Sequence, residues 1–166
     1  MNKKTQILIL LLFLIISSCS TKKKTFFHRK YHNITAKYNG YFNGRENLKY
    51  GISKLEKSNK DDYSKMLSVF KHNNITSSSG HHTYMDKSIK KASIVIQNHS
   101  INIRNKEYCK WIDDSYFLVA KSYYFKGQFL EAKRTFEFVI QKWKKTHLAY
   151  ESELWAAKCN IALGNL

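Results

Sequence analysis

The sequence predicts an all-α fold built from antiparallel helical hairpins. Three observations lead to this prediction: proline is absent from the 166 residues, apolar residues recur at three- and four-residue spacing, and Gly127 divides one such stretch into two parts of similar length. Two helices joined by a glycine-centred turn form an αα-hairpin. We therefore expect one helical domain over residues 32–166, after an N-terminal targeting segment and a tether.

The clearest hairpin lies between Trp111 and Trp143. Two small residues, Ala120 and Ala132, stand on opposite sides of Gly127, where the two helices would cross, and aromatic residues surround them. A unit of about 34 residues with small residues at the helix crossing resembles a tetratricopeptide (TPR) repeat. The usual closing proline is missing, and an ordinary hairpin within a helical bundle is the alternative interpretation.

A second repeat begins downstream, because residues 154–166 repeat the pattern of the first helix. Gly164 follows Gly127 by 37 positions, so a longer loop is expected after Trp143. A TPR hairpin needs neighbours to bury its apolar face, which predicts a short α-solenoid. The partner of the last helix is absent, so we expect either a truncated protein or another chain over this face. The isolated chain is expected to be marginally stable, with four apolar side chains exposed: Leu154, Trp155, Ile161 and Leu163.

Residues 1–18 resemble the signal peptide of a bacterial lipoprotein. A positively charged start precedes an apolar run over residues 7–16, which is too short to span a bilayer. The segment Ile-Ser-Ser-Cys at 16–19 then resembles a lipobox, in which cleavage occurs before the cysteine and its sulfur receives a diacylglycerol. A plain secretory signal with an incidental cysteine is the alternative. The prediction is that lipidated Cys19 anchors the mature chain to a membrane.

Residues 19–31 are expected to form the lipidated N-terminus and a basic tether. The net charge of the chain is +17, which indicates an anionic partner or lysines spread over solvated helix faces. Because no arginine-rich patch or base-stacking motif accompanies the charge, nucleic acid is not expected as a partner. No acidic cluster follows Cys19, and this favours the periplasmic side of the membrane.

Residues 32–58 predict a further, degenerate TPR-like hairpin. Thr35 would cap its first helix, Asn43-Gly44 would form the turn, and Leu48 and Leu55 would line its second helix. Residues 59–82 have loop composition. A helix returns at Thr83, with four apolar residues on one face: Met85, Ile89, Ala92 and Ile96.

The sequence favours no catalytic or metal site, and we expect neither a cofactor nor a small-molecule substrate. His81-His82 suggests a metal site, but two exposed loop histidines without a nearby acidic or cysteine partner are the better interpretation. Asp61-Asp62 and Asp113-Asp114 are adjacent pairs whose side chains diverge along a helix. Cys109 and Cys159 are expected to be small buried residues rather than a disulfide.

Three blocks together resemble a known family: Thr35–Gly51, Met85–Ile101 and Lys106–Gly127, in that order after the lipobox. They are similar to the N-terminal region of the TPR lipoproteins of gliding motility and type IX secretion, the SprE/PorW type. The resemblance implies a non-enzymatic lipoprotein of Bacteroidota that is anchored in the outer membrane, faces the periplasm and supports components of the secretion machinery. This chain departs from the family by ending at Leu166, whereas family members are several times longer.

If the domain is a TPR array, its first helices line a groove that binds a protein partner. The candidate contacts are Asp113, Asp114, Lys121, Tyr124 and Lys158. The alternative function is a stand-alone or truncated lipoprotein that binds the cell wall or acidic surfaces through its lysines. That alternative requires Lys22–Lys24 and the lysines at 87, 90 and 91 to share one face.

Overall fold

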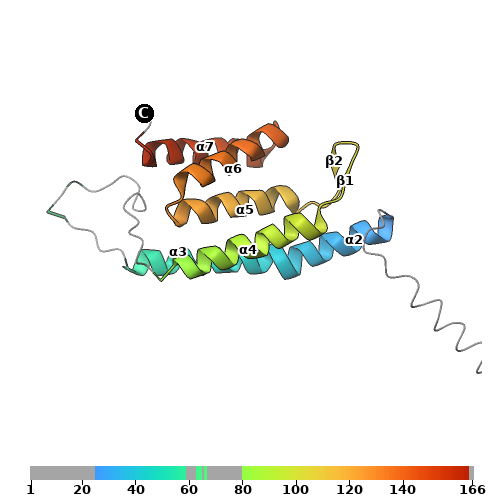
Figure 1. Ribbon diagram of the computed structural model, residues 1–166, viewed down its shortest axis with the longest axis horizontal. Coiled ribbons are helices and arrows are strands. Elements are labelled where there is room, and N and C mark those ends of the chain that lie inside the picture. The colour runs from blue at the N-terminus through green and yellow to red at the C-terminus, as the bar shows by residue number, and fades with distance from the viewer. Residues whose placement is uncertain (1–24, 59–62, 65, 67–79, 165–166) are drawn as a thin grey trace, which may run out of the picture.

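A computed structural model describes residues 25–58, 63–64, 66 and 80–164. The predicted signal peptide, Cys19, the basic residues Lys22–Lys24 and the Asp61-Asp62 pair lie outside this part of the chain. The described elements are α2 (Phe26–Thr35), the π-helical η1 (Ala36–Tyr41), α3 (Phe42–Ser58), α4 (His82–His99), β1 (Asn102–Ile103), β2 (Lys106–Glu107), α5 (Ile112–Phe125), α6 (Phe129–Lys142) and α7 (His147–Ala162) (Figure 1). The all-α prediction is confirmed, with one two-residue strand pair added.

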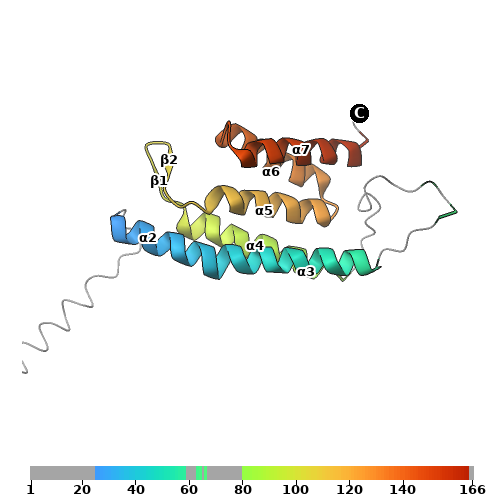
Figure 2. The ribbon, with the colours of Figure 1, turned by 180° about the vertical axis from the view of Figure 1, so that it is seen from behind.

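Residues 26–58 form one continuous helical rod, which we call the N-terminal rod, rather than the predicted hairpin. α2, η1 and α3 follow one another without a break, and the residues at both junctions have right-handed helical dihedrals (Figures 1 and 2). Thr35 does not cap a helix, because its hydroxyl donates to the Tyr31 carbonyl at 2.8 Å inside the rod. The expected turn at Asn43-Gly44 is wrong, and the segment expected to be tether up to residue 31 is helical from Phe26.

The glycines of this rod are contact residues, which explains why the predicted turn is wrong. A methyl group added at Gly40 would overlap Cγ2 of Val95, and one added at Gly51 would lie 2.6 Å from Cε of Met85. Both neighbours belong to α4. A methyl group added at Gly44, between them in sequence, would lie 3.0 Å from Cδ2 of Leu118 in α5, a tight but less severe contact. The missing side chains therefore let the rod pack closely against its neighbours.

α4 packs against both the N-terminal rod and α5. Its buried residues recur at three- and four-residue spacing: Met85, Ser88, Ala92 and Val95. The helix begins at His82, near the predicted Thr83, but its buried face is turned from the expected one, since Ile89 and Ile96 are only partly buried. Ser122 of α5 donates a hydrogen bond to Ser88 at 2.8 Å, which joins α4 and α5 inside the core.

The predicted hairpin around Gly127 is confirmed. Gly127 has a φ of 81°, which a glycine adopts readily. Its amide donates to the Tyr124 carbonyl, and the Gln128 amide donates to the Tyr123 carbonyl, both at 2.9 Å. This pair of bonds is the Schellman motif that ends many helices. The small residues on either side, Ala120 and Ala132, are both fully buried.

The last helix, α7, begins at His147, seven positions before the predicted start of the second repeat. The Thr146 hydroxyl caps it by accepting from the Ala149 amide at 3.2 Å. The expected longer loop after Trp143 is wrong, because only residues 143–146 separate α6 from α7. The offset of 37 residues between Gly127 and Gly164 exceeds the usual repeat of about 34 partly because α7 has 16 residues, whereas α5 has 14.

The helices stack in an order that follows the sequence. Each helix from α3 to α7 packs against the next, and α3, α5 and α7 also contact one another in that order. α7 and α6 consequently lie on the side of α5 away from the N-terminal rod (Figure 1). None of the helices described is both long and apolar enough to cross a bilayer.

We predict that Gly40→Ala destabilises the protein. Crowding Val95, which is β-branched and has little rotamer freedom, should cost about 1–3 kcal/mol, against a helix-propensity gain of about 1 kcal/mol. Gly51→Ala should be milder because the flexible end of Met85 can move away. Urea unfolding measures both changes, with Asn39→Ala at an exposed position of η1 as the control. Equal stability of Gly40→Ala and the control would contradict the close-packing role.

Candidate functional site

A charged face lies where α5 and α7 meet, and we call it the α5–α7 face. It consists of Asp114, Lys121, Glu151, Trp155 and Lys158. The ammonium groups of Lys121 and Lys158 lie 4.8 Å and 4.4 Å from the centre of the Trp155 ring. Trp155 itself stacks on Phe136 with ring centres 6.0 Å apart, so the aromatic surface under the two lysines is held by the core.

Charges on this face are partly removed from water, and their pKa values reflect it. Burial raises the pKa of Asp114 to about 6, and the neighbouring carboxylates of Asp113 and Glu151 add to the shift. Burial lowers the pKa of Lys121, an effect that Glu151 opposes and Lys158 reinforces. A surface with partly desolvated charges of both signs around a fixed aromatic ring is suited to contact with another protein.

Of the five contacts predicted from the sequence, the structure brings three to this face: Asp114, Lys121 and Lys158. Tyr124 belongs to the core, since it is 1% exposed and its ring packs edge-on against Phe129 and Trp155. Asp113 lies in the first turn of α5, where its carboxylate accepts from the Asp114 amide at 3.0 Å. A carboxylate in the first turn is favourable at the positive end of a helix, so this structural position accounts for Asp113.

Glu151 was not among the predicted contacts, and Trp155, predicted to be exposed, is only partly exposed. Leu154 and Ile161 are 57% and 42% exposed, and Leu163 is 38% exposed, as predicted for these three side chains. Tyr150, also exposed, continues the same row on α7 four positions before Leu154. This spacing was visible in the sequence, but the predicted helix began too late to include it.

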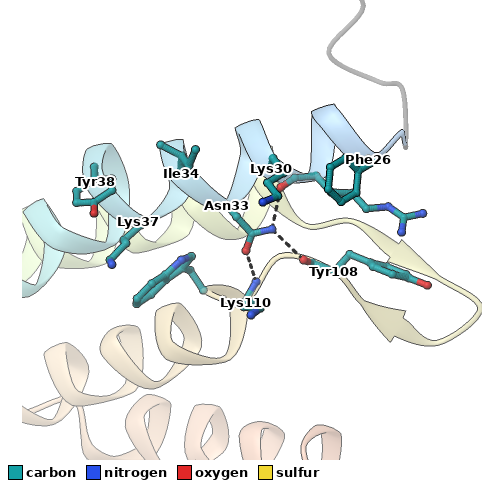
Figure 3. Close-up of a pocket in the computed structure, with 10 residues that line it drawn as sticks. Phe26, Lys30, Asn33, Ile34, Lys37, Tyr38, Tyr108 and Lys110 are labelled. Carbon is teal, nitrogen blue, oxygen red and sulfur yellow. Dashed lines mark hydrogen bonds between the residues drawn. The ribbon is translucent and has the colours of Figure 1, made fainter.

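A second surface feature is a groove between α2 and the loop that precedes α5, which we call the basic groove (Figure 3). It encloses about 540 Å³. Its lining combines four cations with aromatic and apolar side chains and includes no carboxylate: Phe26, Arg29, Lys30, Asn33, Ile34, Lys37, Tyr38, Tyr108, Lys110 and Trp111. This groove was not predicted from the sequence, because residues 26–31 were expected to belong to a tether.

Hydrogen bonds fix the shape of the basic groove. The Asn33 side chain donates to the Tyr108 carbonyl at 3.0 Å and accepts from the Lys110 amide at 2.8 Å, so one residue ties α2 to the loop (Figure 3). The loop is held from its other side by Glu107, whose carboxylate accepts from the Ile101 and Cys109 amides. These hydrogen bonds hold both walls of the groove in place.

Cation–aromatic contacts line the same groove. The Arg29 guanidinium lies 3.9 Å from the centre of the Tyr108 ring, and the Lys37 ammonium lies 5.2 Å from that of Trp111. These contacts hold the cations beside the groove, and a contact with an aromatic ring leaves the charge of a cation in place. The groove can accordingly attract an anion.

The remaining candidate residues, His81 and the two cysteines, are buried inside the fold. His81 is buried, with its Nε2 atom 3.1 Å from the Phe125 carbonyl oxygen, so the prediction of two exposed loop histidines is wrong. Cys109 and Cys159 are free and buried, as predicted, and burial raises the pKa of their thiols to about 11 and about 12. Across the residues that the structure describes, no group of three or more His, Cys, Asp or Glu could hold a metal ion.

In comparisons with known proteins, no family model and no curated protein matches this chain.

We predict that Asp114→Asn stabilises the protein at pH 7 by about 1–2 kcal/mol, after allowance for solvent screening. The pKa of Asp114 is raised in the folded state, so between about pH 4 and pH 6 the native state binds more protons than the unfolded state. Stability should fall as pH rises through this window. Asparagine removes that loss, so the advantage of the variant should disappear below about pH 4.

Chemical denaturation at pH 4 and pH 7 measures the effect of Asp114→Asn. Glu56→Gln, at an exposed position of α3, is the control and should change stability by less than about 0.5 kcal/mol at both values. A variant that is less stable than the wild type at pH 7 would show that the Asp114 carboxylate is favourably paired in the fold.

Proposed function

We propose that this protein is a non-enzymatic, lipid-anchored TPR-like scaffold that serves the type IX secretion and gliding machinery at the periplasmic side of the outer membrane. The observation that carries the proposal is the ordered stack of helices, in which α5 contacts both α3 and α7 and forms the charged α5–α7 face with α7. A scaffold needs such a surface and requires no catalytic group. Its partners are proteins of the machinery and the membrane.

The TPR-like solenoid is supported by three features. The α5–α6 hairpin has fully buried small residues, Ala120 and Ala132, on its two helices, and Gly127 forms its turn. α7 then packs against both members of this hairpin, as the first helix of a following repeat would. The exposed row Tyr150, Leu154 and Ile161 lies on this last helix, where a second helix of that repeat would pack.

The lipid anchor and the location rest on the sequence. The lipobox-like segment ending at Cys19 supports acylation, and two or more acyl chains hold a protein stably on a membrane. The family resemblance supports the proposed role in the type IX secretion and gliding machinery. Its most specific block, Thr35–Gly51, contains the three glycines that pack against α4 and α5, so a structural need accounts for part of that block.

A second candidate function is a stand-alone or truncated lipoprotein that binds the cell wall or acidic surfaces. One observation favours it: Lys87, Lys90 and Lys91 are all exposed on α4 and lie within four positions of one another. Lys22–Lys24, the other half of that hypothesis, lie outside the described residues. Binding to isolated cell-wall material that weakens as ionic strength rises would support this function.

We predict that machinery proteins co-purify with the wild-type protein from its own cells, and that Cys19→Ala reduces this because the chain is no longer held at the membrane. The variant Lys121→Glu/Lys158→Glu should keep membrane attachment but lose partner binding by about tenfold, because it reverses two charges beside Trp155. Affinity purification followed by quantitative mass spectrometry measures both effects.

The matched control is Lys57→Glu/Lys144→Glu, which reverses two exposed lysines elsewhere. If the two double variants lost partners equally, the loss would be due to the change in net charge and not to the α5–α7 face. Recovery of cell-wall material alone, without secretion components, would overturn the scaffold proposal and favour the second candidate.

A further inference from the structure

The N-terminal rod carries an apolar row on the side away from the core. Phe27, Tyr31, Ile34 and Tyr38 follow one another at three- and four-residue spacing, and we call them the α2 stripe. They are 79%, 55%, 58% and 58% exposed. The buried side of the same rod is formed by His32, Ala36 and Gly40. The core therefore does not account for the apolar residues of the α2 stripe.

Positive side chains border this stripe along one edge. Ile34 and Tyr38 belong both to the stripe and to the lining of the basic groove, whose cations are Arg29, Lys30, Lys37 and Lys110. In Figure 3, Ile34 points away from the loop that carries Lys110, whereas Asn33 points toward it. Apolar groups thus project outward beside a hollow lined with cations. The first acidic residue of the whole sequence is Glu46, beyond the end of the stripe.

This combination matches the requirements of a helix that lies in a membrane interface. Such helices place aromatic and aliphatic side chains at the boundary of the acyl chains and keep lysine and arginine at the level of the head groups. Tyrosine suits this depth because its ring is apolar and its hydroxyl is polar. Each lysine or arginine close to an anionic membrane surface strengthens the attraction.

The position of the predicted anchor brings the stripe to the membrane. Cys19 lies six positions before Thr25, the first residue of the described helical region. Six residues span at most about 20 Å even when fully extended. This step rests on the acylation in the proposed function: an acylated Cys19 would hold the start of α2 within that distance of the bilayer.

We propose that α2 lies along an anionic phospholipid surface, with the α2 stripe in the interface and the basic groove holding a lipid head-group phosphate. The contact would fix the orientation of the domain, which an acyl anchor alone leaves free. An acidic segment of a partner protein carries negative charge as a lipid phosphate does, so it is the alternative occupant of the basic groove. The lipid surface is favoured because the outward side chains beside the groove are apolar over three helical turns, from Phe27 to Tyr38.

The test measures vesicle binding without the acyl anchor. The mature chain from residue 19, carrying Cys19→Ala, is co-sedimented with phosphatidylcholine vesicles that do or do not contain about 30% phosphatidylglycerol. We expect binding to the anionic vesicles that weakens as ionic strength rises. Phe27→Ser/Tyr31→Ser/Ile34→Ser should weaken it by about tenfold or more, and Lys30→Gln/Lys37→Gln should weaken it by about tenfold.

Matched controls replace exposed residues of the same kinds elsewhere in the chain. Tyr50→Ser/Ile94→Ser/Leu130→Ser removes three exposed apolar side chains from α3, α4 and α6, and Lys57→Gln/Lys144→Gln removes two exposed lysines. Both should bind vesicles as the parent does. Circular dichroism melts check that each variant is folded, and only folded variants are compared.

Equal binding to both kinds of vesicle, or binding that survives the stripe substitutions, would overturn the proposal. Tight binding of polyglutamate that depends on Lys30 and Lys37, together with weak vesicle binding, would overturn it in favour of an acidic protein partner. The anchor is tested separately, by labelling the wild-type protein with a radioactive fatty acid in cells. A failure of acylation therefore remains distinguishable from a failure of α2 to bind lipid.

Discussion

The arrangement depends on the close approach of the N-terminal rod to α4. Gly40 and Gly51 lie so near Val95 and Met85 that a methyl group could not be added without movement. Protein interiors are packed as densely as organic crystals, so this spacing determines which side chains can sit opposite the rod. It fixes the rod on α4, and Gly44 extends the contact to α5. The basic groove lies along this rod, and the α5–α7 face lies on the other side of α5, where α7 packs against α5 and α6.

The same residue type has two uses here, and this explains which part of the fold could be predicted from the sequence. Gly127 ends a helix with a positive φ, and the periodic residues on either side of it predicted the hairpin correctly. Gly44 sits within a helix and serves a contact, although Asn43-Gly44 has the composition of a turn. Only knowledge of the opposing helix distinguishes the two uses, and local sequence contains none.

The candidate site shows a similar limit. Lys121 and Lys158 could be placed on one face from helical spacing and the assumed repeat, and both indeed lie on the Trp155 ring. Tyr124 has the same spacing but is buried, because α7 covers it. Periodicity identifies the residues that share a helix face. It does not identify which parts of that face a later helix will cover, and Glu151 entered the site from such a helix.

The two proposed surfaces are compatible because they lie in different layers of the molecule. The N-terminal rod and α7 are separated by α5, and α7 packs against α5 and α6 (Figures 1 and 2). The α2 stripe points away from the core of this stack, so a membrane that binds it would leave α7 accessible on the other side. An acyl chain limits only the distance of a domain from the membrane, whereas a helix lying on the lipid also limits its rotation. With α2 on the membrane, the α5–α7 face would meet partners in a restricted orientation, which reduces the rotational freedom lost on binding.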